Sequence, residues 1–404
     1  MLLSRRDAVV VFIAFAFAYF FSALVRAITA TLAPTLTQEF ALNARDLGLL
    51  AGGYFIGFAI TQLPLGRWLD RHGPKRVVLG FMAVAVAACL AFSLATGFSG
   101  LLAARVLCGV GLSASLMAPM TGFRRWLTPH AQMRANSWML MTGSSGMVAS
   151  TLPVQWLMPV VGWRPLFWGL AALLALAWVV IAWKVPAWPA ARPADGDGDT
   201  SYREVWRHPY FRRMVPVGLI TYGGMVAMQT LWAGPWLVRV AGYTPAQAAT
   251  GLFTINLCML ASFWGWGLLT PWLFARGWTT DRLIARGLPL GFAAMVAIIL
   301  QGEEAGAWHW AAFCAGTTFA SLAQPAVGLA FPPALAGRAL SAYNLVIFSG
   351  IFLVQWGIGL LVDGFRALGW ADPPSFRAAM AVFLVASVAA WAWSVAGRQD
   401  NQRQ

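Results

Sequence analysis

Long apolar segments separated by short polar stretches run through the whole chain. Each is roughly twenty residues long, the length that a helix needs to cross the hydrocarbon core of a membrane. Polar, glycine or proline residues end each segment. Twelve such segments predict twelve membrane-spanning helices: 8–33, 47–69, 77–96, 99–122, 136–159, 165–184, 213–238, 248–271, 283–301, 307–329, 340–362 and 376–396. The predicted fold class is therefore an all-α membrane protein.

The composition supports this prediction and narrows the choice of partners. The chain is 59% hydrophobic and only 10% charged, which is far too apolar for a soluble fold of this length. The net charge of +14 comes mostly from basic residues that lie outside the apolar segments. We therefore expect contact with anionic membrane lipid and no binding to nucleic acid.

The distribution of basic residues predicts the orientation. An even number of spans places both termini on one side, and that side with its loops carries 21 of the 28 Lys and Arg residues. Five lie on the opposite side and two lie within spans. Both termini are predicted to be cytoplasmic, because cytoplasmic loops carry the excess of basic residues.

The chain divides near its midpoint. The only long polar stretch, 185–212, is predicted to be a flexible cytoplasmic linker between an N-terminal bundle of six helices, 1–184, and a C-terminal bundle of six, 213–404. A weak repeat at a shift of 204 residues supports two related halves: Arg134, Ala135, Ser137, Ser145 and Gly146 recur as Arg338, Ala339, Ser341, Ser349 and Gly350.

Residues 66–76, GRWLDRHGPKR, are basic and lie between two apolar segments. Such a charged stretch cannot lie in hydrocarbon, so it must form a short loop at a membrane face. Gly66 and Gly73 allow close backbone approach and a tight turn, and Asp70 can serve a helix N-terminus. An ordinary positive loop would explain the charges, but not the two glycines and the acid at these spacings.

The pattern G-x-x-x-D-R-x-G-x-[KR]-[KR] resembles the signature loop between spans 2 and 3 of the major facilitator superfamily, and every position matches. The resemblance implies a monomeric secondary transporter of the bacterial inner membrane, with two pseudo-symmetric six-helix bundles, alternating access and no cofactor. It also implies a cytoplasmic gate. Spans 2 and 11 would pack closely at Gly66, and Asp70 would face the start of span 11. The remaining gate residues would be Arg71, Gly73, Lys75, Arg76, Arg124, Arg125 and Arg338.

Arg26 lies inside the first predicted span. Exposure of its side chain to lipid near the midplane would cost about 2.5–3.5 kcal/mol on the insertion scale, so it must face protein or water. Tyr19, Ser22, Arg26 and Thr29 are spaced three, four and three residues apart, which places them on one side of a helix. This stripe is the best candidate for the wall of a binding cavity.

Arg105 lies at a similar predicted depth in span 4. The resemblance places spans 1, 4, 7 and 10 around the cavity, so two arginines there predict an anion-binding site. The alternative for Arg105 is structural: with Gly109 and Gly111 it matches the superfamily's span 4 pattern R-x-x-x-G-x-G, in which the arginine bonds to neighbouring carbonyls.

The second half contributes two further polar stripes. Span 7 carries Tyr222, Gln229 and Trp232 at helical spacing, and span 10 carries Thr317, Ser321 and Gln324. Aromatic residues at such spacing are more often packing residues. Each stripe can therefore be interpreted either as a cavity wall or as part of the helix packing.

The acids and histidines lie outside the span centres, so a carboxylate proton relay is not supported. Uniport, anion exchange, or symport in which the substrate carries the proton fit better. No embedded nucleophile, acid–base group or metal cluster indicates an enzyme. The alternative cargoes are copper or another soft metal, because methionines and cysteines lie in the spans, and drugs exported by a multidrug carrier.

Overall fold

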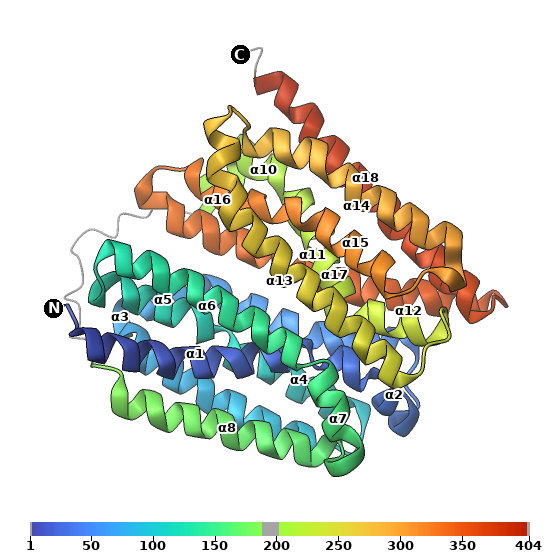
Figure 1. Cartoon of the computed structure of the whole chain (residues 1–404), viewed down its shortest axis with the longest axis horizontal. Helices are drawn as coiled ribbons and strands as arrows, with labels where there is room; N and C mark the ends of the chain where they lie inside the picture. The colour runs from blue at the N-terminus through green and yellow to red at the C-terminus, as the bar shows by residue number, and fades with distance from the viewer. Residues whose placement is uncertain (1, 188–201, 402–404) are drawn as a thin grey trace. The chain divides into compact units, whose positions relative to one another are not determined.

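Helices follow one another along the chain in the computed structural model, which describes residues 2–187 and 202–401 (Figure 1). Those residues form no strand. Ten helices are long and apolar enough to cross a membrane. The predicted all-α membrane fold is confirmed, as expected for a chain whose backbone polar groups must pair within each span.

The chain forms two compact units. The first consists of Met1–Ile28 and Gly53–Gly198, and the second consists of Thr29–Gly52 and Asp199–Gln404. Residues 29–52, expected in the N-terminal bundle, therefore group with the C-terminal part of the chain. Of the predicted linker, 188–201 lie outside the described residues, and its last part forms a short helix and the start of the next.

The first unit contains one helix that continues through a sharp turn. This helix, α3 (Ala44–Leu94), consists of two spans joined at Gly73, where φ is +77°. Its first turns belong to the second unit. Rings of Phe92 and Phe167, 4.3 Å apart, pack its second span against α8. The other helices are α1 (Arg5–Ala27), α4 (Phe98–Leu112), α5 (Ala114–Trp126), α6 (Pro129–Ala149), α7 (Leu152–Val161) and α8 (Trp163–Lys184).

The second unit begins with α2 (Thr29–Phe40) and continues after the linker. Its regular helices are α9 (Tyr202–Arg207), α10 (Pro209–Pro216), α11 (Gly223–Ala227), α12 (Ala233–Arg239), α13 (Pro245–Ala275), α14 (Thr280–Gln301), α15 (Ala307–Thr317), α16 (Ala323–Leu329), α17 (Pro333–Ala367) and α18 (Asp372–Asn401). Wider π-helical turns form η1 (Val217–Tyr222) and η2 (Met228–Trp232), and tighter 3-10 turns form η3 (Gly302–Glu304) and η4 (Thr318–Leu322).

Two of the twelve predicted spans are helical but are not among the ten helices that are long enough to cross a membrane. The span predicted at 136–159 breaks at Thr151, between α6 and α7, where the hydroxyls of Ser150 and Thr151 donate to carbonyls one turn earlier. The span predicted at 307–329 tightens at η4, where the Thr318 hydroxyl donates to the Ala315 carbonyl. Two causes explain both breaks: these hydroxyls compete with backbone N–H groups for the carbonyls, and prolines lie nearby in the sequence.

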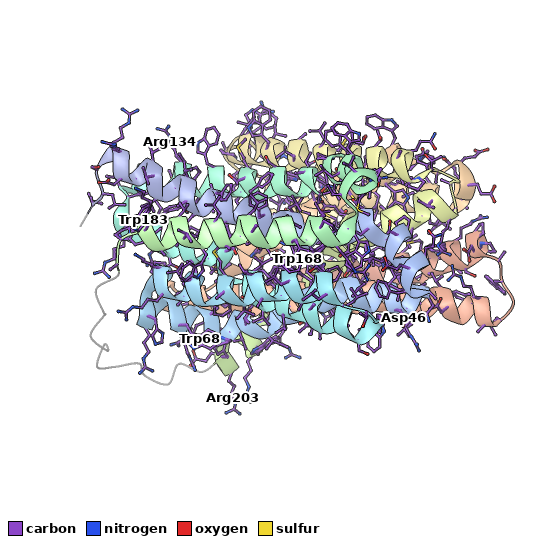
Figure 2. The ribbon with its side chains drawn as sticks, turned by 90° about the horizontal axis from the view of Figure 1, so that it is seen from below. Asp46, Trp68, Arg134, Trp168, Trp183 and Arg203 are labelled. Carbon is purple, nitrogen blue, oxygen red and sulfur yellow. The ribbon has the colours of Figure 1, made fainter. Side chains whose placement is uncertain are left out.

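Several tryptophans on the first unit point away from the protein. Trp168 and Trp183 extend outward from α8, and Trp183 is 83% exposed (Figure 2). Trp68, Arg134 and Trp183 gather toward the same end of this unit. Exposed aromatic residues of this kind are typical of the lipid-facing surface of a membrane protein.

Candidate functional site

Arg26 occupies the last turn of α1, inside the first unit. The phenol groups of Tyr19 and Tyr54 lie beside its guanidinium, and its Cζ atom is 5.7 Å from the centroid of the Phe58 ring. The Nε atom is buried and has no hydrogen-bond partner. The side chain is half-buried overall, so the guanidinium keeps donor capacity that these neighbours leave unused.

The predicted stripe on the first span is only partly one group. Tyr19 and Ser22 are buried in the same unit as Arg26, and the Ser22 hydroxyl points toward the Leu112 carbonyl at the end of α4. Thr29 is also buried, but it begins α2 and belongs to the second unit. Three of the four residues therefore belong to the first unit.

Arg105 is fully buried and holds the end of α1 against α4. Its Nη1 donates to the Val25 carbonyl over 2.9 Å, one of the last carbonyls of that helix. Its Cζ lies 5.2 Å from the centroid of the Tyr54 ring, while Nε and Nη2 have no partner. The contact with the Val25 carbonyl supports the structural interpretation of this arginine, because helix C-termini favour cations.

Tyr54 contacts both arginines, and the sequence interpretation missed it. The ring faces Arg105, the phenol approaches Arg26, and the buried hydroxyl has no hydrogen-bond partner. A Cβ atom on Gly109 would lie 1.9 Å from the Tyr54 carbonyl, so glycine at 109 lets α4 reach the backbone of α3. The sequence offered one sign of this role, which is that Tyr54 is the single tyrosine of the second apolar segment.

The cluster of Arg26, Tyr54 and Arg105 carries positive charge without a counter-ion. Among the described residues, neither arginine forms an ion pair with a carboxylate. A buried charge without a partner is costly, and the cost falls when an anion binds. Phenol hydroxyls can donate further hydrogen bonds to such an anion. The cluster therefore has the chemistry of an anion-binding site.

Span 7 is less regular than its sequence predicted. Tyr222 ends η1, and Gln229 and Trp232 lie in η2, so π-helical turns change the register that ordinary helical spacing assumed. Gln229 donates to the Asn256 side chain of α13 over 2.9 Å. Trp232 Nε1 donates to the Gln355 carbonyl of α17 over 3.1 Å. These two contacts join span 7 to its neighbours in the second unit.

The span 10 residues use most of their polar groups within the protein. The Thr317 hydroxyl donates to the Phe313 carbonyl, and the Ser321 hydroxyl donates to the Thr318 carbonyl. Gln324 alone of the three reaches another helix, where it donates to the Asn344 side chain of α17. Asn256, Gln355 and Asn344 were not predicted, because single amides in apolar segments follow no motif.

The basic residues predicted for the cytoplasmic gate lie near the Gly73 turn of α3, at the end of α5 and near the start of α17. Arg71, Arg76, Arg124 and Arg125 are exposed, whereas Lys75 and Arg338 are half-buried. No atom lies within 4 Å of the place where Gly66 would carry a Cβ. The Asp70 side chain lies outside the described part of the structure, so its pairing with Arg124 or Arg125 stays a prediction.

Metal-binding side chains do not gather in the described ranges. No three His, Cys, Asp or Glu residues there come together as a possible metal site. Cys89, Cys108 and Cys314 are buried and Cys258 is half-buried, all as free thiols.

A family profile decides the identity of the fold. The family model of the Major Facilitator Superfamily matches residues 15–355, which is most of the chain. The chain belongs to the Major Facilitator Superfamily. The resemblance inferred from the loop motif is thereby confirmed.

The superfamily relatives are transporters of small solutes. The D-galactonate transporter of Escherichia coli is 23% identical over 411 residues and covers 90% of each chain. The niacin transporter NiaP of Acinetobacter baylyi is 23% identical over 312 residues and covers 69% of each chain. The 4-hydroxybenzoate transporter PcaK of Pseudomonas putida is 30% identical over 154 residues, 38% of this chain and 34% of the relative.

Solved structures agree on the fold. A bacterial homologue of the human lysosomal transporter Spinster, crystallised inward-facing and unoccupied, matches with a TM-score of 0.78 at 17% identity, over 98% of both chains. The nucleoside transporter NupG, as its D323A mutant, matches with a TM-score of 0.78 at 12% identity, over 96% of this chain and 99% of its own length. The family match and the relatives together make this superfamily member a multi-pass membrane transporter.

The irregular helices of this superfamily member coincide with its candidate residues. The first span breaks after α1 at Ile28, and span 4 breaks between α4 and α5 at Ser113. Span 7 contains η1 and η2, and span 10 contains η4. Span 5 is interrupted too. Interrupted helices in transporters commonly border the substrate site, and π-helical turns often mark functional positions.

Proposed function

We propose that this chain moves a small organic anion across the bacterial inner membrane by alternating access, with Arg26 as the residue that binds the anion. The observation that carries the proposal is the Arg26 guanidinium, which has a buried, unpartnered Nε and no carboxylate partner among the described residues. A carboxylate on the substrate would supply the missing charge and acceptors.

The relatives support an organic substrate with a carboxylate. Three of them are named for niacin, D-galactonate and 4-hydroxybenzoate, which share a single carboxyl group and differ elsewhere. A site with one accessible guanidinium and phenol donors suits one carboxylate. Tyr19 and Tyr54 are assigned as additional donors, and Arg105 is assigned to support the helix end and raise the local positive potential.

Flux in proteoliposomes tests the proposal. The purified chain is reconstituted and supplied with labelled nicotinate, 4-hydroxybenzoate, galactonate and nitrate, and with Cu(I) and a cationic dye for the two alternative cargoes. We expect saturable uptake of at least one organic carboxylate and none of the metal or dye. Uptake of copper or the dye alone would replace the proposal with the corresponding alternative.

Asp70 is proposed to act at the cytoplasmic gate. By the superfamily resemblance it faces the start of span 11, and a carboxylate near a helix N-terminus stabilises that contact by about 0.3–1 kcal/mol. We expect Asp70→Asn to slow the maximal uptake rate about twofold to fivefold with unchanged protein levels. Uptake kinetics identical to those of the parent would remove the gating role.

A further inference from the structure

Residues 44–52 lie directly on α17 within the second unit. A Cβ atom on Gly48 would lie 2.3 Å from the Gln355 carbonyl oxygen, and one on Gly359 would lie 2.4 Å from the Ala44 carbonyl oxygen. Backbone therefore touches backbone along this contact, which joins the beginning of the second span to the end of the eleventh. We refer to the contact of residues 44–52 with residues 352–363 as the rim seam.

One carboxylate fastens the end of the rim seam. Asp363 Oδ2 accepts a hydrogen bond from the Arg45 backbone N–H over 2.6 Å, and Oδ1 accepts one from the Ala44 N–H over 3.2 Å. These N–H groups open α3 and have no partner within their own helix. Asp363 is one of the acids that lie outside the span centres, and the sequence pattern around it predicts no role.

Ion pairs hold this carboxylate in position. Arg366 lies 3.1 Å from Asp363 and 2.7 Å from Asp372, and Asp372 is 3.2 Å from Arg239 of α12. Acidic and basic side chains therefore alternate from Asp363 and Arg366 of α17 through Asp372 of α18 to Arg239 of α12. All are partly exposed, so each pair alone is weak, but the series fixes the geometry of Asp363.

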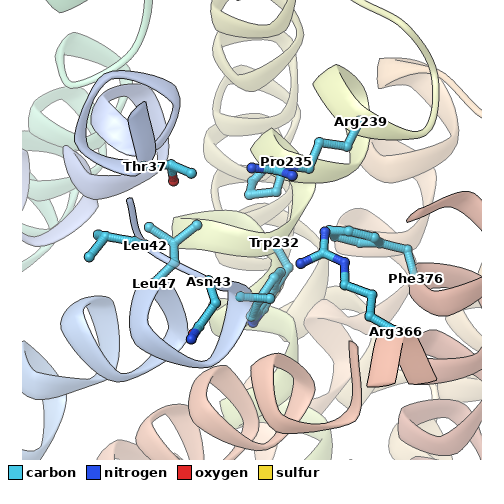
Figure 3. A pocket seen from close by; sticks show the side chains of 10 residues that line it. Thr37, Leu42, Asn43, Leu47, Trp232, Pro235, Arg239, Arg366 and Phe376 are labelled. Carbon is cyan, nitrogen blue, oxygen red and sulfur yellow. The ribbon is translucent and has the colours of Figure 1, made fainter. Parts of the chain in front are cut away.

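The space beside these ion pairs is small. A cavity of about 10 Å³, room for roughly one water molecule, lies between residues 37–47 and the side chains of Trp232, Arg366 and Phe376 (Figure 3). Its arginines already have carboxylate partners, so it is not a site for a further anion.

We propose that Asp363 is the latch of the outer gate: it holds residues 29–52 on the second unit while that side is closed and releases α3 when the carrier opens outward. The inference rests on the alternating access of the proposed function and on the orientation predicted from the basic residues. It concerns a contact that needs no substrate, so it can be tested independently. Release would break two hydrogen bonds to a charged acceptor, and this sets the stability of the closed gate.

Thiol labelling in nanodiscs measures the opening. Thr37, which lines the cavity, is replaced by cysteine in the full chain, and its modification by a hydrophilic maleimide is timed without substrate. The chain with Thr37 intact corrects for the native thiols. Nanodiscs expose both faces, so the predicted orientation does not influence the result. We expect slow labelling in the parent and labelling at least about tenfold faster with Asp363→Ala.

Matched variants separate a latch from general destabilisation. Asp363→Asn keeps the shape and one acceptor and should accelerate labelling less than Asp363→Ala. Asp281→Asn removes the ion pair with Arg213 elsewhere in the same unit and should leave labelling unchanged. Parent-like labelling in monodisperse Asp363→Asn and Asp363→Ala protein would overturn the latch. Absent anion uptake with accelerated labelling would instead contradict only the proposed substrate.

Discussion

Replacing Arg26 with alanine is expected to lower kcat/KM for the transported carboxylate by at least about 30-fold. Truncation of one partner of a buried, hydrogen-bonded charge pair costs about 2–5 kcal/mol, and each 1.4 kcal/mol is a factor of ten. The loss should appear both in initial uptake rates and in the thermal stabilisation that the anion gives to the purified protein.

The controls for Arg26 test charge, geometry and folding separately. Arg26→Lys keeps the charge but loses the planar donor set, so we expect partial recovery. Arg134→Ala removes an exposed arginine of the same unit and should leave uptake unchanged. Anion uptake in Arg26→Ala at half the parent rate or more would refute the assigned role.

Gly109→Ala is expected to give the largest loss of stability. The new methyl group would lie 1.9 Å from the Tyr54 carbonyl oxygen, so α4 must move away from α3. Overpacking of this kind costs about 1–3 kcal/mol, and it would also displace Tyr54 and Arg105. Thermal unfolding in detergent, read by tryptophan fluorescence, measures the loss.

Gly80→Ala supplies the matched control for this prediction. Gly80 is also helical, but no atom lies within 4 Å of its missing Cβ. The gain in helix propensity is shared by both variants, so their difference isolates the contact with Tyr54. Equal unfolding temperatures for the two variants would show that the α3–α4 contact does not constrain the site.

The fold was predictable because its signals are local. Apolar length identified the spans, and the loop motif around Gly73 identified the family, with the positive φ of Gly73 as the physical reason for its glycine. The breaks at Thr151 and η4 were harder. They arise where hydroxyls and prolines compete with helical hydrogen bonds, and the hydropathy of a segment does not report that competition.

The candidate site was only partly predictable. Arg26 stood out because a charge inside an apolar segment needs a partner, but Tyr54 is an ordinary residue for a span. Its role depends on α4 lying against α3, a contact between separate segments. The π-helical turns of span 7 also altered the assumed register. Asp363 carries no sequence signal for its role, because its two bonds to the start of α3 join residues that are separated by 319 and 318 positions in the chain.

Comparison of an anion with its neutral amide tests the central claim most directly. Proteoliposomes containing the purified chain are supplied with labelled nicotinate or nicotinamide, and with 4-hydroxybenzoate or 4-hydroxybenzamide, under identical conditions. We predict saturable uptake of at least one carboxylate, no saturable uptake of its amide, and loss of the carboxylate uptake in Arg26→Ala. Equal transport of acid and amide, unaffected by Arg26→Ala, would contradict recognition of an anion by the Arg26 guanidinium.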